Sequence, residues 1–158
     1  TVFGGGQEGG LRSGTENVPG IAGMLAAVRA FRALPDPAGR MAGLRRRLWA
    51  GIRAAVPDAR LNGPEENAGH ILNCTFPVKG EVLLHALEGE GVLCSTGSAC
   101  SSHKKSKSHV LAAMGRTPQE IDGALRFSLC PMNTQEEMDQ AAAAIGRCVN
   151  LLRAFRRR

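Results

Sequence analysis

Residues 95–102 read STGSACSS and place one cysteine, Cys100, in a run of small residues. Four positively chargeable side chains follow it, namely His103, Lys104, Lys105 and Lys107. Small neighbours leave the sulfur accessible, and nearby cations favour the thiolate, which is the nucleophilic form of cysteine. The alternative is a buried cysteine that acts as a small apolar side chain. Because the flanking residues are polar, we favour a reactive thiol at Cys100.

The composition is typical of a soluble globular domain. The chain has 158 residues, of which 43% are hydrophobic and 22% charged, and its net charge is +6. The positive charge gathers in short clusters such as residues 45–47 and 156–158, and no aromatic residues interleave with them. We therefore expect solvated helix faces, with residues 45–47 largely in solvent, and no nucleic-acid partner.

The five cysteines do not form a pattern typical of a metal site or a disulfide framework. Their number is odd, and no C-x-x-C pair occurs. We expect reduced thiols, no metal, and a cytoplasmic location. We also expect Cys74, Cys94, Cys130 and Cys148 to be packed inside the protein. No apolar stretch approaches the length of a membrane span, and no signal peptide is evident, so we expect no membrane partner.

Periodicity and capping residues predict several helices. Apolar residues recur at helical spacing over residues 19–34 and 41–56, and prolines end both runs. Residues 80–88 fit a shorter helix. Ser108 is placed to cap a helix that runs to Met114, with Gly115 just beyond it. The capping boxes TPQE at 117–120 and TQEE at 134–137 open two more helices, of which the second is the last in the chain.

Alternating residues predict two strands, over residues 70–76 and 124–129. In the first strand, Leu72, Cys74 and Phe76 share one face, while Ile71, Asn73 and Thr75 share the other. The predicted fold class is therefore α/β, with a short sheet flanked by helices.

The first sixteen residues are rich in glycine and precede a predicted helix. Such a loop is typical of a phosphate cradle, but a flexible linker is an equal alternative. Because the sequence starts at Thr1 rather than Met, we expect it to be a piece of a longer protein.

Three segments together resemble the cysteine desulfurases, which are fold-type-I enzymes dependent on pyridoxal phosphate (PLP). They are residues 4–17 (GGGQE and RSGTEN), the Cys100 run with residues 108–115 (SHVLAAMG), and residues 125–137 (LRFSL and NTQEE). The resemblance covers essentially the whole chain. It implies the C-terminal part of such an enzyme. Residues 1–35 would end the large PLP domain and begin a connecting helix. Residues 36–158 would complete that helix and form a small domain that bears the cysteine loop.

The resemblance also implies roles for three residues. Cys100 matches the nucleophile that takes sulfur from the substrate L-cysteine, holds it as a persulfide and leaves alanine. Arg126 matches the arginine that binds the substrate carboxylate, a task suited to a planar guanidinium. Thr15 matches a residue that reaches across a homodimer interface to the PLP phosphate of the other subunit. His103 and the following lysines would lower the pKa of Cys100, whereas His109 is expected to be structural.

The family's PLP lysine lies ahead of the residues that match the first motif, and no lysine precedes Lys79 in this sequence. We therefore expect this chain alone to be inactive. The parent enzyme would serve iron–sulfur cluster assembly or thiolation through an acceptor or scaffold protein, with cysteine or selenocysteine as substrate. The alternative is a non-catalytic sulfur-relay or docking module that works beside a separate PLP-bearing half.

Overall fold

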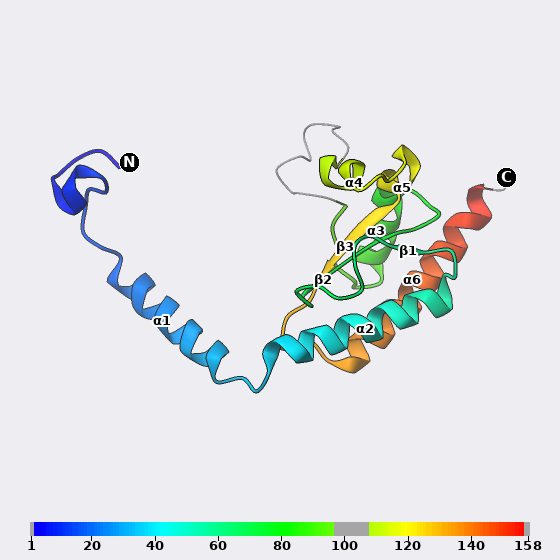
Figure 1. The fold of residues 1–158 in the computed structure, drawn as a ribbon, viewed down its shortest axis with the longest axis horizontal. Helices are drawn as coiled ribbons and strands as arrows, with labels where there is room; N and C mark the ends of the chain where they lie inside the picture. Colours follow the sequence, from blue (N-terminus) through cyan, green and yellow to red (C-terminus); the bar gives the residue numbers. More distant parts are fainter. Residues whose placement is uncertain (1, 97–107, 157–158) are drawn as a thin grey trace. The chain divides into compact units, whose positions relative to one another are not determined.

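The computed structural model describes residues 2–96 and 108–156. The chain divides into two compact units, residues 1–37 and 38–158 (Figure 1). Which domains of a longer enzyme they correspond to stays a prediction.

The first unit consists of a glycine-rich loop and one helix. The loop contains a short 3-10 helix, η1 (Gln7–Gly10), and a bridge joins Val2 to Arg12. Helix α1 (Val18–Arg32) begins after Asn17, whose side chain accepts a hydrogen bond from the Gly20 N–H at 3.0 Å. This confirms the first predicted helix. No residue of α1 is buried.

The second unit contains five helices among the residues that the structure describes, and all five confirm sequence predictions. The long helices are α2 (Pro37–Ala55) and α6 (Gln135–Arg156). The shorter ones are α3 (Gly80–Gly89), α4 (His109–Ala113) and α5 (Pro118–Asp122). Ser108 caps α4, and Thr117 and Glu120 form the predicted capping box of α5. None of the described helices is long and apolar enough to cross a lipid bilayer.

A three-stranded antiparallel sheet lies at the centre of the second unit. Its strands are β1 (Arg60–Leu61), β2 (Ile71–Thr75) and β3 (Ala124–Ser128), in that spatial order. Strands β2 and β3 were predicted. Strand β1 was not, because two residues are too few to show an alternating pattern and only the pairing with β2 defines them. The α/β prediction of a short sheet flanked by helices is confirmed.

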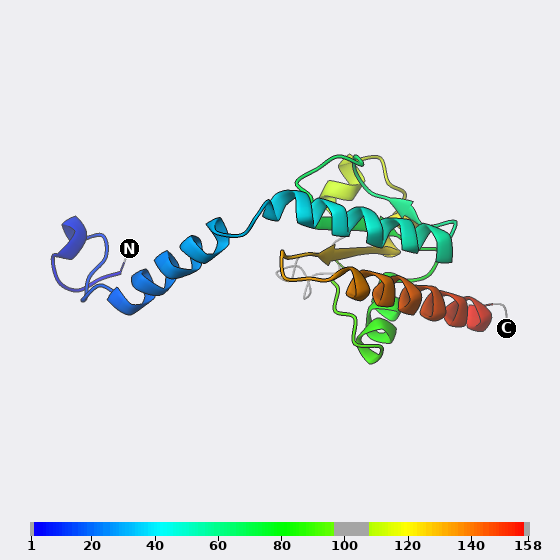
Figure 2. The same cartoon turned by 90° about the horizontal axis from the view of Figure 1, so that it is seen from below.

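One face of the sheet carries the hydrophobic core. Leu72, Cys74 and Leu125 are fully buried, and the ring of Phe127 meets that of Phe76 edge-on with 6.5 Å between centroids. Helices α2 and α6 run alongside the sheet (Figure 2). They contact each other where a Cβ on Gly51 would lie 2.6 Å from the Ala142 methyl group. Small residues therefore let the two long helices approach closely and close the core.

The structure corrects the expectation that residues 45–47 lie largely in solvent. Arg46 and Arg47 are exposed, but Arg45 is only 4% exposed. Its guanidinium donates hydrogen bonds to the backbone carbonyls of Ile71 at 3.0 Å, Glu65 at 2.7 Å and Pro64 at 3.3 Å. These carbonyls belong to the loop between β1 and β2 and to the start of β2. Arg45 therefore holds that loop against α2.

Replacing Arg45 is expected to destabilise the second unit far more than replacing its neighbour. Arg45→Ala leaves three carbonyl groups without their donor, and we expect the free energy of unfolding to fall by about 3 kcal/mol. Arg46→Ala, one position along the same helix, should change it by less than about 0.5 kcal/mol. Urea unfolding followed by circular dichroism measures both, and equal losses would contradict the bonding role of Arg45.

Candidate functional site

A row of polar residues crosses the face of the sheet opposite the core. Asn73 of β2 stands directly opposite Arg126 of β3, and Arg126 in turn pairs with Ser95 through an isolated antiparallel bridge. On the other side of β2, the Asn62 N–H donates to the Asn73 carbonyl at 2.9 Å. Directly opposed residues of an antiparallel sheet project from the same face. Asn62, Asn73, Arg126 and Ser95 therefore form one polar row.

Backbone pairing brings the Arg126 and Asn73 side chains close together. The Arg126 N–H donates to the Ser95 carbonyl at 2.7 Å, and the Ser95 N–H donates to the Arg126 carbonyl at 3.0 Å. Both backbone groups of Arg126 are thus turned away from β2. Asn73 and Arg126 are then a non-hydrogen-bonded pair, in which the Cα atoms lie about 4.5 Å apart and the side chains approach most closely. Arg126 is half-buried, and within the described residues its guanidinium has no hydrogen-bond acceptor.

The predicted nucleophile, Cys100, lies outside the described residues, but both flanks of its loop are described. Ser95, on one flank, is bonded to the backbone of Arg126, as above. On the other flank, the Ser108 hydroxyl accepts a hydrogen bond from the Leu111 N–H at 3.3 Å at the start of α4. Cys100 follows Ser95 by five positions, and a fully extended chain over five steps spans about 17 Å at most. The segment that leads to Cys100 is therefore bonded, at Ser95, to the strand that carries Arg126.

Thr15 lies in a turn of the first unit that Arg12 holds in place. The Arg12 guanidinium donates to the carbonyls of Gly14 at 2.7 Å and Thr15 at 2.8 Å, and Gly14 has a φ of +91°, which suits glycine. Thr15 is exposed, and within the described residues its hydroxyl has no partner. One hydroxyl fits a single contact to the phosphate of PLP. No described residue around this turn would hold the rest of the cofactor.

The remaining cysteines differ in exposure and acidity. Burial raises the pKa of the Cys74 and Cys148 thiols, and it raises that of half-buried Cys94 to about 11, with a smaller contribution from Glu88. Cys130 is exposed, so the expectation that it is packed inside the protein is wrong. Its strand ends one residue earlier than predicted, before the chain turns toward α6. Within the described residues, no group of three or more His, Cys, Asp or Glu side chains is arranged to hold a metal ion.

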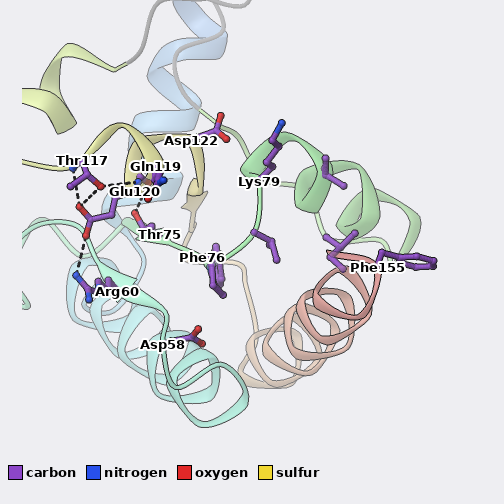
Figure 3. Close-up of a pocket in the computed structure, with 14 residues that line it drawn as sticks. Asp58, Arg60, Thr75, Phe76, Lys79, Thr117, Gln119, Glu120, Asp122 and Phe155 are labelled. Atoms are coloured by element: carbon purple, nitrogen blue, oxygen red, sulfur yellow. Dashed lines mark hydrogen bonds and ion pairs between the residues drawn. The ribbon is translucent and has the colours of Figure 1, made fainter. Parts of the chain in front are cut away.

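A cavity of about 1000 Å³ lies beyond the Thr75 end of β2, and its lining includes Phe76 and Phe155 (Figure 3). Its charged residues carry both signs. Arg60 pairs with Glu120 at 3.1 Å, and hydrogen bonds from Thr117, followed in size by the charge of Arg60, lower the pKa of that carboxyl group. Arg126 does not line the cavity. We therefore place the candidate site at the polar row, where the Arg126 guanidinium has no acceptor among the described residues.

The sequence matches the family model of the class-V aminotransferases over residues 5–141. The chain belongs to this family. The match includes Thr15, Cys100 and Arg126, and it spans both units of the structure.

Similar members of the class-V aminotransferase family are cysteine desulfurases. IscS of Clostridium botulinum strain Hall is 40% identical over 143 residues, which cover 87% of this chain and 36% of the relative. IscS of Methanosarcina thermophila is 41% identical over 155 residues, which cover 96% of this chain and 38% of the relative. A solved NifS-like protein is 37% identical with a TM-score of 0.79, covering 96% of this chain and 38% of its own. The resemblance predicted from the motifs is confirmed, and the chain spans somewhat over a third of its relatives' length.

Sequence reasoning found some residues of the candidate site and missed others. The motifs singled out Arg126, and the alternation in β2 put Asn73 on the polar face. Neither showed that Asn73 stands opposite Arg126, nor that Ser95 and Asn62 extend the row on both sides. These neighbours come from three other chain segments. Only the register between the segments reveals them.

We expect alkylation to separate the five thiols by exposure and acidity. At pH 8 a thiol with a pKa of about 11 is about one part in a thousand thiolate, so Cys94 should react slowly, as should buried Cys74 and Cys148. Cys130 and Cys100 should react first with iodoacetamide, as measured by peptide mass spectrometry. In the Cys130→Ser variant, Cys100 should be the one fast site, and faster labelling of Cys94 would contradict this assignment.

Proposed function

We propose that this chain forms the sulfur-accepting part of a PLP-dependent cysteine desulfurase. The observation that carries the proposal is the backbone pairing of Ser95 with Arg126. It tethers the segment that leads to Cys100 directly to the strand of the arginine. L-Cysteine has a carboxylate at one end and a thiol at the other. One substrate molecule can therefore bind Arg126 through its carboxylate and present its sulfur to Cys100.

Arg126 binds and orients the substrate. Its guanidinium offers two parallel N–H donors that match the two oxygens of a carboxylate. Because no described residue engages these donors and the side chain is only half-buried, they are available to a ligand. The neighbouring residues Leu125 and Phe127 are buried in the core, which fixes the strand and the direction from which Arg126 leaves it.

Cys100 receives the sulfur. Its thiolate attacks the substrate sulfur, a new S–S bond forms, and the C–S bond of the substrate breaks with its electron pair left on the carbon side. The sum is L-cysteine plus the Cys100 thiol giving L-alanine plus a Cys100 persulfide. PLP, when bound, supplies the electron sink for this bond cleavage. A protein acceptor, such as an iron–sulfur scaffold, then takes the terminal sulfur from Cys100.

Thr15 would act at a different place. In a homodimer its exposed hydroxyl would donate to the PLP phosphate held by the other subunit, and the Arg12 clamp would keep the turn in position. A cytoplasmic location agrees with the need for reduced thiols at Cys100 and at the acceptor.

In the parent enzyme, replacement of Cys100 and of Arg126 should have separable effects. Cys100→Ser should abolish persulfide formation and lower kcat at least 100-fold. A serine hydroxyl stays protonated near neutral pH, so it cannot replace the thiolate as a nucleophile. Arg126→Lys keeps the charge but loses the paired donors, and should raise KM for cysteine about tenfold or more. Alanine formation and gel-based persulfide labelling measure these effects. Cys130→Ser and Arg46→Lys are the matched controls, and normal persulfide labelling in Cys100→Ser would overturn the proposal.

The 158-residue chain by itself should form no alanine from cysteine and PLP. Its four lysines are Lys79, Lys104, Lys105 and Lys107, and none occupies the segment in which the family carries its PLP lysine. Amino-acid analysis of the reaction mixture measures this. Alanine formation that disappears in Cys100→Ala would contradict the expectation. Persulfide on Cys100 only after mixing with a separate PLP-bearing half would favour the sulfur-relay alternative.

A further inference from the structure

The hydrogen bonds of the polar row determine which end of the Asn73 side chain is engaged. The backbone carbonyl of Glu120 can only accept, so the Thr75 hydroxyl donates to it, at 3.0 Å. The Thr75 oxygen is then an acceptor for Asn62, whose Nδ2 lies 2.9 Å away. The same Nδ2 donates its second hydrogen to Asn73 Oδ1 at 2.8 Å. The backbone carbonyl of Glu120 thus determines the orientation of the side-chain amides of both Asn62 and Asn73.

Two of the three side chains in this chain of bonds are buried. Asn62 is 9% exposed and Thr75 is 6% exposed. Asn73 is half-buried at the end of the chain of bonds, and its Oδ1 is occupied by Asn62. Its Nδ2 amino group, with two hydrogens, has no acceptor within the described residues. Asn73 therefore offers donors, and only donors, to a ligand on the polar face.

Two sets of unengaged donors stand side by side at this place. Asn73 and Arg126 are directly opposed in the pairing that brings side chains closest, and neither guanidinium nor amino group has an acceptor among the described residues. A ligand that satisfies both must carry a negative charge and at least two acceptor oxygens. A carboxylate has both properties.

We infer that Asn73 is a second substrate-binding residue, whose Nδ2 donates to the same carboxylate that Arg126 binds. The inference rests on the proposed function, because the carboxylate in question is that of the amino-acid substrate. A role in holding the sheet together would need only the Oδ1 end of Asn73. That role leaves unexplained the amino group, which has no acceptor among the described residues.

The test uses the parent enzyme and two readouts. Asn73→Ala should raise KM for L-cysteine about tenfold with kcat changed less than about twofold, as for a lost hydrogen bond to a charged group. The dissociation constant for L-alanine, which has the same carboxylate and no sulfur, should rise by the same factor in calorimetry. In an Arg126→Ala background, Asn73→Ala should add less than about threefold, because both residues act on one carboxylate.

Asn62→Ala is the matched control, since it removes the Asn62–Asn73 bond but leaves the Asn73 amino group in place. Its effect on KM should be clearly smaller than that of Asn73→Ala. If Asn73→Ala does not fold, Asn73→Asp keeps the volume and the acceptor for Asn62 but replaces the donor, and both constants should rise more than tenfold.

Unchanged constants in a folded Asn73 variant would overturn the inference, as would a tenfold effect that persists fully in the Arg126→Ala background. If Arg126→Ala raises KM and Asn73→Ala does not, the proposed function stands and this inference falls. If Arg126→Ala itself leaves KM and the L-alanine constant unchanged, the carboxylate site of the proposed function fails instead.

Discussion

The candidate site depends on the antiparallel register between β2 and β3. Side chains alternate between the two faces of a strand, so a slip of one residue would send Arg126 into the core and bring buried Leu125 and Phe127 to the polar face. That slip would bury an unpaired charge and expose two large apolar side chains. The packing of the core on one face of the sheet therefore determines which side chains the other face presents.

Hydrogen bonds explain why polar groups can be buried beside the site. Arg45 is a cation in the interior, and its charge is stabilised by three backbone carbonyls of the loop that leads into β2. Asn62 and Thr75 are buried polar residues whose hydrogen bonds connect β1, β2 and α5. Both groups fix the strand that carries Asn73. The buried polar groups therefore hold the strand that carries the candidate site in a fixed position.

Much of the fold could be predicted because its signals are local. Ser108 caps α4, and the TPQE box opens α5, since a capping side chain bonds to a backbone group only three residues away. The alternation in β2 placed Leu72 and Cys74 on one face, and both are buried. Strand β1, the burial of Arg45 and the exposure of Cys130 could not be predicted in this way. Each depends on which distant segment of the chain lies next to the residue, and a local sequence pattern does not show this.

The sequence by itself determined the helices, the strands β2 and β3 and, through its motifs, the family. The roles of Cys100, Arg126 and Thr15 stay a proposal. Only the tertiary structure decided that Ser95, Arg126, Asn73 and Asn62 stand in one row, with Arg126 bonded through its backbone to the segment that leads to Cys100. The physical reason is that helix caps and strand alternation act over a few residues. Cross-strand neighbours are instead set by register, which depends on packing the whole core.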